Sequence, residues 1–417
     1  MEEVLKRIIL ENMEMIRNKK LIIRNFPIPS TENIKVLTGI RRSGKTHQLF
    51  QKCRSFEPER VLFIDFEDER LIQLFTLSNY DVIIDSYKRL FPDQKPVLFF
   101  DEIQSLPNWH LYLKRLYSQG FDIHVTGSNA NLLSSEIATF LKGRAVETHI
   151  YPFSFKEFLQ LKNISFDEKD YYTSGHIILN TFDEYLKFGG FPEVIKAPVA
   201  DKRTVIRSIH ELILYKDLAS KYEKNDFLFQ LITSKLVENV GKAFSLSKLA
   251  NKIKPIYKTS NPTVIDYVHL LSMPFVAKQV FMYKKSFVQR EMERKIYFQD
   301  NSFITQNTID TDFARLMENC CFIHFDRYYD KVFYYVTHNN LEVDFICQRD
   351  DKLSAFQVAY SLNDPETRQR EIKALVKCAE EMNLKKATII TYNETGSEKI
   401  ENLCIDIIPL WKFLLHG

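Results

Sequence analysis

The feature that most constrains this sequence is a glycine-rich run near its start, Gly39-Ile40-Arg41-Arg42-Ser43-Gly44-Lys45-Thr46. The run has the pattern G-x-x-x-x-G-K-[ST], follows a strand-like stretch at 34–38 and opens a helix-like stretch at 47–53, which is the context of a phosphate-binding loop. Glycines at both ends let the main chain curve until its N–H groups point at phosphate oxygens. The next helix adds the positive end of its dipole. The expected phosphate-binding residues are Gly39, Arg42, Ser43, Gly44, Lys45 and Thr46.

Two of these residues carry specific chemistry. We expect Lys45 to act in catalysis by placing its ammonium group on the β- and γ-phosphates of a nucleotide. We expect the Thr46 hydroxyl to bind Mg²⁺. The loop therefore predicts a Mg²⁺-dependent nucleotide site.

A second motif supports this interpretation. Val97-Leu98-Phe99-Phe100 is an apolar run that fits a strand buried in a parallel sheet, and Asp101 and Glu102 follow it. Ligands of open α/β sheets bind at the carboxyl ends of strands, so Asp101 is expected in the Mg²⁺ shell. Glu102 is placed to orient or deprotonate an attacking water. Taken alone, the motif would also suit an ordinary strand that ends in an acidic turn.

Further strand-like stretches at 61–66 and 123–129 make the layout resemble that of AAA+ ATPases. The resemblance implies ATP as the nucleotide. It also implies a polar residue at the tip of the fourth strand that senses the γ-phosphate, either Ser128 or Asn129. The stretch 132–144 matches the region where such ATPases carry an arginine finger, and Arg144 is the candidate. A guanidinium there would stabilise the transferred phosphoryl group, in cis or from a neighbouring subunit.

Several short motifs narrow the resemblance, and they occur in order along the chain. They are Asp101-Glu102-Ile103-Gln104, Pro107-Asn108-Trp109, Thr126-Gly127-Ser128, Gly143-Arg144, 151–158 (YPFSFKEF) and Gly189-Gly190-Phe191-Pro192. Together they resemble a large prokaryotic family of extended AAA-type ATPases with a C-terminal region of largely unassigned function. The similarity runs nearly end to end.

Length and composition favour a multidomain globular protein of the cytoplasm. The chain has 417 residues, 45% hydrophobic and 27% charged, and no run of about 18 apolar residues that would span a membrane. Its six cysteines form no C-x-x-C pair, which fits a reducing compartment. We expect an α/β fold of four parts: an ATPase core at 1–150, which begins with an amphipathic helix; a helical lid at 151–222; a winged helix-turn-helix at 223–288; and a restriction-endonuclease-like α/β domain at 289–417.

A basic segment suggests a nucleic-acid partner. Residues 235–295 carry twelve Lys and Arg against four Asp and Glu, a net charge of +8, although the whole chain is only +3. This region contains helix-like stretches at 228–240, 245–250 and 262–271, and a β-hairpin arm at 275–283 with Lys284 and Lys285 at its tip or exit. This order resembles a winged helix-turn-helix, whose third helix enters the major groove of DNA. The expected DNA-binding residues are Lys252, Lys254, Lys258, Ser260, Asn261, Thr263, Lys284 and Lys285. A solvated basic face and a protein-binding winged helix remain alternatives.

The C-terminal part resembles the PD-(D/E)xK nuclease fold, in which an Asp and a Glu-x-Lys motif hold Mg²⁺ and activate water. Asp344 takes the Asp position, and Glu318 in the preceding helix could be a further ligand. The Glu-x-Lys position reads Gln357-Val358-Ala359, which supplies neither carboxylate nor ammonium. We therefore expect Glu318, Asp344 and Gln357 to form a degenerate nuclease site without cleavage activity. Asp344 would also suit a strand end that pairs with a nearby lysine.

These patterns favour an AAA+ ATPase with ATP and Mg²⁺ as cofactors that acts on duplex or branched DNA. A finger acting in trans would require a homo-oligomer such as a hexameric ring. The alternative from a different class is a nucleotide-switched scaffold that binds protein partners and is indifferent to DNA. An ATP-dependent nuclease is a third interpretation, and Gln357 and Ala359 disfavour it.

Overall fold

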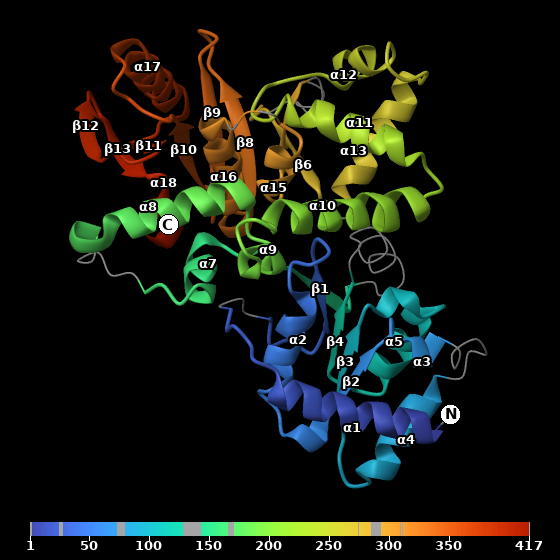
Figure 1. The fold of residues 1–417 in the computed structure, drawn as a ribbon. Coiled ribbons are helices and arrows are strands. Elements are labelled where there is room, and N and C mark those ends of the chain that lie inside the picture. Colours follow the sequence, from blue (N-terminus) through green and yellow to red (C-terminus); the bar gives the residue numbers. More distant parts are fainter. Residues whose placement is uncertain are drawn as a thin grey trace. The chain divides into compact units, whose positions relative to one another are not determined.

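The computed structural model describes residues 2–24, 28–72, 80–127, 143–165, 171–273, 275–284, 293–308, 310 and 312–416. The chain forms two compact units (Figure 1). The first comprises residues 1–151 together with 273–275, and the second comprises 152–272 and 276–417. Each unit is described by itself below.

A five-stranded sheet forms the centre of the first unit. Its strands are β1 (Ile34–Thr38), β2 (Val61–Asp65), β3 (Val97–Asp101), β4 (Ile123–Thr126) and β5 (Ala145–His149). They lie in the order β2-β3-β4-β1-β5, and all neighbours pair in parallel. The predicted parallel sheet is therefore confirmed. The order inserts β4 between β1 and β3, which carry the two sequence motifs.

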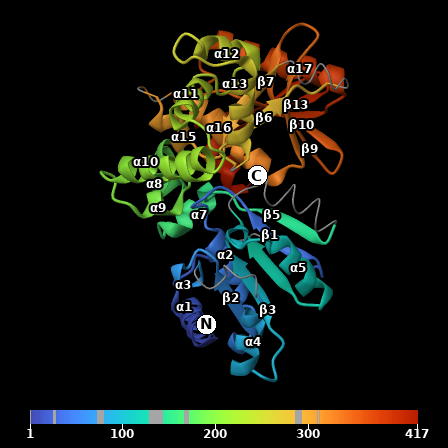
Figure 2. The same ribbon diagram turned by 90° about the vertical axis from the view of Figure 1, so that its right-hand side faces the viewer.

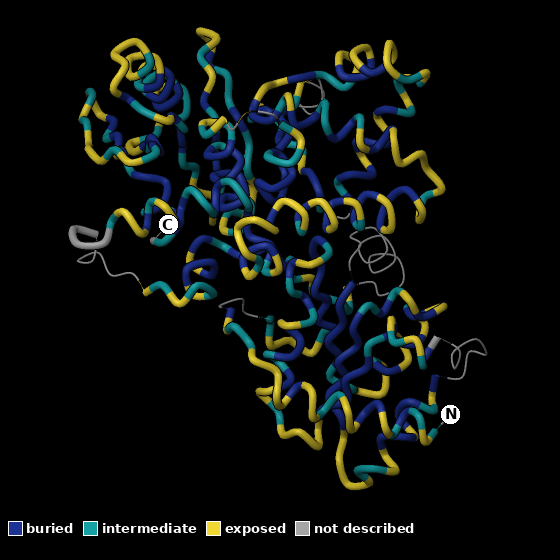
Figure 3. Tube along the Cα trace, viewed as in Figure 1, coloured by how far each residue is buried: buried dark blue, intermediate teal, exposed yellow. Residues whose placement is uncertain are grey.

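Helices cover both faces of this sheet because alternate strand residues point to opposite sides. On one face, apolar residues of α1 (Glu2–Asn18), α4 (Asp81–Leu90) and α5 (Trp109–Ser118) pack against the strands. On the other face, α2 (Lys45–Cys53) packs through Leu49, Phe50 and Cys53. The central strands are buried along their whole length (Figure 3). The short helices of this unit are α3 (Glu69–Ile72), η1 (Pro58–Arg60) and η2 (Ile103–Ser105).

The second unit begins with helices. They are α7 (Phe155–Leu161), α8 (Tyr171–Phe188), α9 (Pro192–Lys196), α10 (Lys202–Leu212), the π-helical segment η5 (Ile213–Ser220), α11 (Asp226–Val237), α12 (Leu246–Ile253) and α13 (Asn261–Ser272). The predicted helix at 155–161 is confirmed, and its capping box explains its start: the Ser154 side chain accepts from Glu157 N–H, and the Glu157 carboxylate accepts from Ser154 N–H. The segment predicted as a lid, 151–222, thus belongs almost wholly to this unit.

A hairpin follows α13. Strands β6 (Ala277–Phe281) and β7 (Arg294–Phe298) pair in antiparallel fashion, and Phe244 exchanges two main-chain hydrogen bonds with Arg294 at the edge of β7. The domain boundary predicted at residue 288 separates these two paired strands. Strand pairing is not local in sequence, and the pattern of residues 275–283 did not indicate that 294–298 would be the partner strand.

A six-stranded mixed sheet forms the C-terminal part, in the order β12-β13-β11-β10-β9-β8. Its strands are β8 (Lys331–Val336), β9 (Glu342–Arg349), β10 (Lys352–Val358), β11 (Lys386–Thr391), β12 (Gly396–Ile400) and β13 (Leu403–Pro409). Helix α17 (Pro365–Met382) packs on one face. Figure 2 shows three strands of the sheet, β9, β10 and β13, near α17. On the other face, Phe325 of α16 (Phe313–Tyr328) and Phe413 of α18 (Leu410–His416) meet Phe345 and Phe356 of the sheet. The short helix α15 (Ser302–Gln306) precedes α16.

The Gly189-Gly190 pair marks a close main-chain approach within the second unit. Phe153 N–H donates to Gly190 O at 2.7 Å, and Gly190 N–H donates to Asp300 Oδ2 at 2.7 Å. A Cβ on Gly190 would lie 2.2 Å from Phe153 O. Only hydrogen fits at this position.

We therefore expect Gly190→Ala to lower the free energy of unfolding by about 2 kcal/mol or more, because the main chain must shift to admit a methyl group. Gly396→Ala is the matched control, since its Cβ would meet nothing closer than Ile407 at 3.6 Å. Chemical denaturation of both variants measures the difference. Equal stability of the two would contradict the packing described.

Candidate nucleotide-binding site

The glycine-rich run forms a tight loop between β1 and α2. Gly39 and Gly44 have φ angles of 145° and 97°, and Arg42 between them also has a positive φ of 68°. A Cβ on Gly39 would lie 2.2 Å from Ile150 O, so the loop can pass this carbonyl only with glycine there. The local geometry explains both glycines of the motif.

The residues present fit a phosphate group. Ser43 is fully buried in the loop, and its Oγ has no hydrogen-bond partner within the described residues. Lys45 is also buried, and its ammonium group folds back onto Gly39 O at 3.0 Å and Ile40 O at 3.3 Å. A buried hydroxyl and a buried ammonium group beside it in the same loop both gain from an anion.

A buried carboxylate lies beside the loop. Thr46 Oγ1 donates to Asp101 Oδ2 at 2.7 Å, and Thr126 Oγ1 donates to Asp101 Oδ1. Burial raises the pKa of Asp101 to about 7, with Glu102 adding to the shift and the two hydroxyls opposing it. Thr46 and Asp101 are thus brought together as expected, in a place where a divalent cation would relieve the buried negative charge.

Glu102 adopts a left-handed conformation, with φ 48°, directly after β3. Its N–H donates to Thr126 Oγ1 at 2.9 Å, and its carboxylate accepts a hydrogen bond from Gln104 Nε2. The Thr126 hydroxyl therefore joins the metal-site carboxylate and the main chain of Glu102. Sequence reasoning missed Thr126 because the strand was extended to residue 129, whereas β4 ends at Thr126.

Ser128 and Asn129, the two candidates for the γ-phosphate sensor, lie outside the described residues. Arg144 is described, and it lies at the amino end of β5, where its carbonyl accepts from Ile34 N–H at 2.8 Å. The phosphate loop follows the opposite, carboxyl end of the neighbouring strand β1. The Arg144 guanidinium lies 6.0 Å from the Tyr117 ring centre. Arg144 is therefore separated from the loop of its own unit by the length of a strand.

The described members of the predicted DNA-binding set lie in α12, in the connection from α12 to α13, in the first turn of α13 and after β6, all in the second unit. Lys252, Lys254 and Lys258 are exposed and form no ion pair with any described residue. Ser260 Oγ accepts from Thr263 N–H at 3.2 Å, so this pair also caps the helix. Asn261 opens α13, Lys284 is exposed at the end of the β6 arm, and Lys285 lies outside the described residues.

The three residues of the predicted degenerate nuclease site do converge, and a lysine that sequence reasoning missed lies among them. Lys295 of β7 is fully buried, and its Nζ lies 2.7 Å from Glu342, 3.3 Å from Glu318 and 3.4 Å from Asp344. Gln357 accepts from Asp344 N–H at 3.0 Å. Asp344 thus pairs with a lysine, the alternative noted from the sequence.

Charge explains this arrangement. Burial acts to lower the pKa of Lys295, but Glu318, Asp344 and Glu342 together hold it above its ordinary value. Burial holds the pKa of Asp344 above its ordinary value, while Lys295 opposes the shift. The negative charge of these three carboxylates is thus partly neutralised by an ammonium group of the chain itself.

None of the described helices is long and apolar enough to cross a membrane. No group of three or more His, Cys, Asp or Glu side chains is arranged around a metal position in the described part. Mg²⁺ held by Thr46, Asp101 and substrate phosphates does not require such a group.

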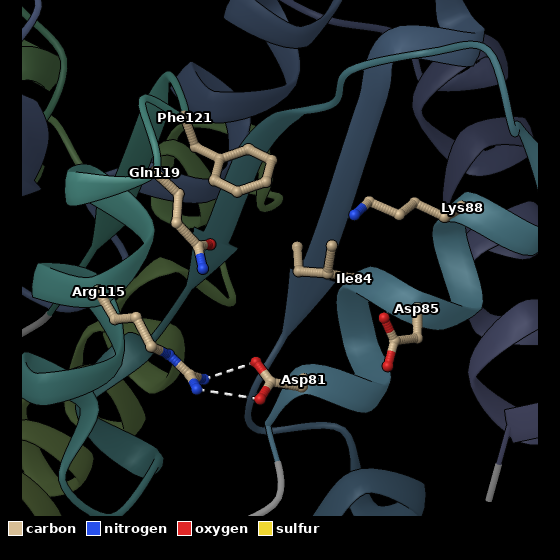
Figure 4. Close-up of a pocket in the computed structure, with 7 residues that line it drawn as sticks. All are labelled: Asp81, Ile84, Asp85, Lys88, Arg115, Gln119 and Phe121. Atoms are coloured by element: carbon tan, nitrogen blue, oxygen red, sulfur yellow. Dashed lines mark hydrogen bonds and ion pairs between the residues drawn. The ribbon is translucent and has the colours of Figure 1, made fainter.

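An open hollow of about 500 Å³ lies between α4 and α5 of the first unit (Figure 4). Gln119 and Phe121, in the connection that enters β4, place it near the amino ends of the strands. Arg115 and Asp81 form an ion pair of 2.6 Å across it. The hollow is separate from the phosphate loop, and its charges largely neutralise one another.

Comparison with known proteins agrees with this site. Residues 31–159 match the family model of an AAA domain, residues 179–310 match a domain of unknown function, DUF8612, and residues 313–413 match another, DUF4143. With the P-loop and the parallel sheet, the class is therefore an AAA-type ATPase.

Full-length relatives define the family. The uncharacterised protein MJ1544 of Methanocaldococcus jannaschii is 33% identical over 431 aligned residues, which cover 98% of this chain and 95% of the relative. An uncharacterised protein of Haemophilus influenzae is 31% identical over 84% of this chain and 88% of its own length. This chain belongs to the family that contains both proteins. Among solved structures, the Walker-type ATPase paby2304 of Pyrococcus abyssi shares 15% identity at a TM-score of 0.42, covering 74% of this chain and 95% of that one.

The bridging role of Thr126 gives a prediction. We expect Thr126→Val, which keeps the shape but removes the hydroxyl, to lower ATP turnover about tenfold or more, because a charge-assisted hydrogen bond to Asp101 and the acceptor for Glu102 N–H are both lost. Thr126→Ser keeps the hydroxyl and should retain most of the activity. Steady-state phosphate release measures both variants, and full activity of Thr126→Val would contradict the role.

The Lys295 cluster gives a second prediction. We expect Lys295→Met to lower the free energy of unfolding by about 3–5 kcal/mol, since it leaves buried carboxylates without a cation. The folded-state pKa of Asp344 is already raised and would rise further, so the loss should grow as pH rises from 5.5 to 8. Lys278→Met is the control, because Lys278 is an exposed partner of Asp326 on the same hairpin. A pH-independent loss equal to the control would contradict this account.

Proposed function

We propose that this protein is a Mg²⁺-dependent AAA+ ATPase that binds and remodels duplex or branched DNA, with ATP hydrolysis driving domain movement in a homo-oligomer. The observation that supports the ATPase most directly is the bridge Thr46–Asp101–Thr126 beside a loop with a buried, unpartnered hydroxyl. Each element of the proposal has its own support in the described residues.

The phosphate loop supplies binding and charge. The main-chain N–H groups of residues 39–46 and the N-terminus of α2 would hold the phosphates of ATP. Lys45, already aimed at the loop interior through Gly39 O and Ile40 O, would exchange these carbonyls for phosphate oxygens. An ammonium group gains more from an anion than from neutral carbonyls, so binding is favoured.

Asp101 and Glu102 divide the remaining chemistry. Thr46 and Asp101 would hold Mg²⁺, which neutralises charge on the transferred phosphoryl group. Glu102, the next residue, would orient the attacking water and accept its proton. Gln104 donates to one oxygen of the Glu102 carboxylate, which leaves the other oxygen to accept the proton.

Arg144 supports the oligomer. It lies a strand length away from the phosphate loop of its own unit, because it precedes the amino end of β5 and the loop follows the carboxyl end of the parallel strand β1. A catalytic guanidinium in that place would have to act on the nucleotide of a neighbouring subunit. A closed ring, such as a hexamer, satisfies this requirement for every subunit.

The basic part of the second unit supports DNA as the partner. Three helices, α11, α12 and α13, are followed by the β6–β7 hairpin, and Phe244 before α12 bridges to β7. This arrangement favours a winged helix-turn-helix, with α13 as the helix that meets the major groove. Lys252, Lys254 and Lys258, at the end of α12 and in the connection to α13, are exposed and form no ion pair within the described residues, so they can contact phosphates.

The C-terminal sheet would contribute binding or assembly rather than cleavage. Two of its strands carry Asp344 and Gln357, and Lys295 fills the charged position between the acids. The Glu-x-Lys positions read Gln357 and Ala359, and the lysine that is present, Lys295, is engaged by the carboxylates around it. We propose a nuclease-like scaffold that has lost cleavage.

The test is ATP hydrolysis by the full chain with no DNA, single-stranded DNA, linear duplex and a four-way junction. We expect stimulation by duplex or branched DNA, which weakens with rising salt because phosphate contacts release counterions. Glu102→Gln should lower turnover by about 100-fold or more in every condition.

The triple variant K252E/K254E/K258E should abolish stimulation by DNA but keep the basal rate. The matched control K373E/K385E/K386E reverses the same number of exposed charges elsewhere in the second unit. Turnover that no DNA changes would favour the nucleotide-switched scaffold instead. Equal loss of stimulation in both triple variants would remove the specific role of the α12–α13 region.

A further inference from the structure

Arg24 occupies an unusual position in the first unit. It lies in the irregular stretch after α1, yet only 3% of it is exposed. Its guanidinium donates to two main-chain carbonyls, Ser43 O at 3.1 Å through Nη1 and Tyr151 O at 2.9 Å through Nη2. One carbonyl belongs to the phosphate loop, and the other belongs to the last residue before the chain enters the second unit.

The main chain of Arg24 is fixed as well. Its N–H donates to Gln51 Oε1 at 3.0 Å, and its carbonyl accepts from Gln51 Nε2 at 3.1 Å. Gln51 lies on α2, the helix that the phosphate loop opens. The main chain of Arg24 is thus anchored to α2, while its side chain contacts the phosphate loop and Tyr151.

The bond to Ser43 O has a consequence for phosphate binding. A peptide unit is planar, so the Ser43 carbonyl and the Gly44 N–H point in opposite directions. By holding Ser43 O, Arg24 sets the direction of the Gly44 N–H. A Cβ on Gly44 would meet Arg24 Nη1 first, at 3.8 Å, which places the guanidinium directly against this peptide. The orientation of one donor of the phosphate nest therefore depends on Arg24.

The second bond reaches the point where the chain crosses between the units. Ile150 N–H donates to Thr38 O at 2.7 Å, and Ile150 O faces Gly39, so residues 150–151 run along the base of the loop. The ring centre of His149 lies 4.3 Å from that of Tyr151 and 4.1 Å from that of Phe275. Phe275 belongs to the segment by which the chain returns to the first unit. The segment that leaves the first unit, at 149–151, and the segment that returns to it, at Phe275, therefore lie together beside the phosphate loop.

We propose that Arg24 is a positioning residue that sets the shape of the phosphate loop and transmits its occupancy by nucleotide to the chain crossing at Tyr151. The proposal rests on the nucleotide-binding function proposed above. When phosphates engage the Gly44 N–H, the Ser43 peptide is pulled and the guanidinium moves with it. Because the same guanidinium holds Tyr151 O, the crossing responds to the nucleotide without any change in the strands of the sheet.

The test compares Arg24→Met, Arg24→Lys and a matched control, Arg54→Met, in the full chain. Arg54 also donates its guanidinium to a main-chain carbonyl of the first unit, Ile16 O at 2.7 and 3.0 Å, but on the end of α1. Two quantities are measured: the Kd for Mg²⁺ with ADP or a non-hydrolysable ATP analogue, and the hydrogen exchange of peptides covering 145–158 with and without the nucleotide.

We expect Arg24→Met to raise the Kd about tenfold or more, since two charge-assisted hydrogen bonds are lost, and to abolish the nucleotide-dependent change in exchange at 145–158. Arg24→Lys keeps the charge but can reach only one carbonyl, so it should raise the Kd less and still lose the response at 145–158. Arg54→Met should match the unsubstituted chain in both measurements, although its melting temperature can fall.

The outcomes separate the two proposals. If the unsubstituted chain binds no nucleotide, the proposed function itself fails. If the unsubstituted chain does bind nucleotide, but Arg24→Met has the same Kd and the same exchange response at 145–158 as Arg54→Met, only the role of Arg24 is overturned. Should Arg24→Met not fold, Arg24→Lys decides: unchanged affinity together with an intact response at 145–158 would overturn the proposal.

Discussion

The first unit depends on one buried carboxylate. Asp101 accepts hydrogen bonds from Thr46 at the start of α2 and from Thr126 at the end of β4, so it joins three elements that the sequence separates widely. The sheet order makes this possible, because β4 stands between β1 and β3 and brings its last residue to the gap between the two motifs. The same burial that raises the pKa of Asp101 makes a cation at this position favourable. A buried carboxylate that a cation would stabilise therefore lies at the carboxyl ends of the strands.

The two units handle buried negative charge in opposite ways. In the first, the Asp101 carboxylate accepts hydrogen bonds from the hydroxyls of Thr46 and Thr126, and the proposed cation is Mg²⁺ bound from solution. In the second, Glu318, Asp344 and Glu342 surround the Lys295 ammonium, so the required cation is covalently part of the fold. An internal ammonium needs no binding step and cannot polarise a water as a divalent ion does. This contrast distinguishes the proposed Mg²⁺ site from a cluster whose positive charge is part of the chain.

Local patterns predicted most of the first unit and only part of the second. The strands around 34–38, 61–65 and 97–101 were visible because each is a short apolar run that ends in turn residues. Strand β5 was missed, since its Ala-Val-Glu-Thr-His sequence at an edge of the sheet is only partly buried and lacks that signal. Lys295 was missed because its partners come from α16 and β9, far along the chain. Arg24 was missed for the same reason, as its partners Ser43 O and Tyr151 O are main-chain atoms that no side-chain pattern reveals.

The parallel arrangement of β1 and β5 determines where a nucleotide could influence the second unit. Two parallel neighbours end at the same edge, so the exit of the chain after His149 must lie beside the loop that follows Thr38. The Ile150–Thr38 hydrogen bond and the close approach of Ile150 O to Gly39 fix that proximity. The return segment packs Phe275 against His149 and therefore lies at the same edge. A signal from the phosphates needs to pass through only a few contacts, and the rigid sheet behind them need not deform.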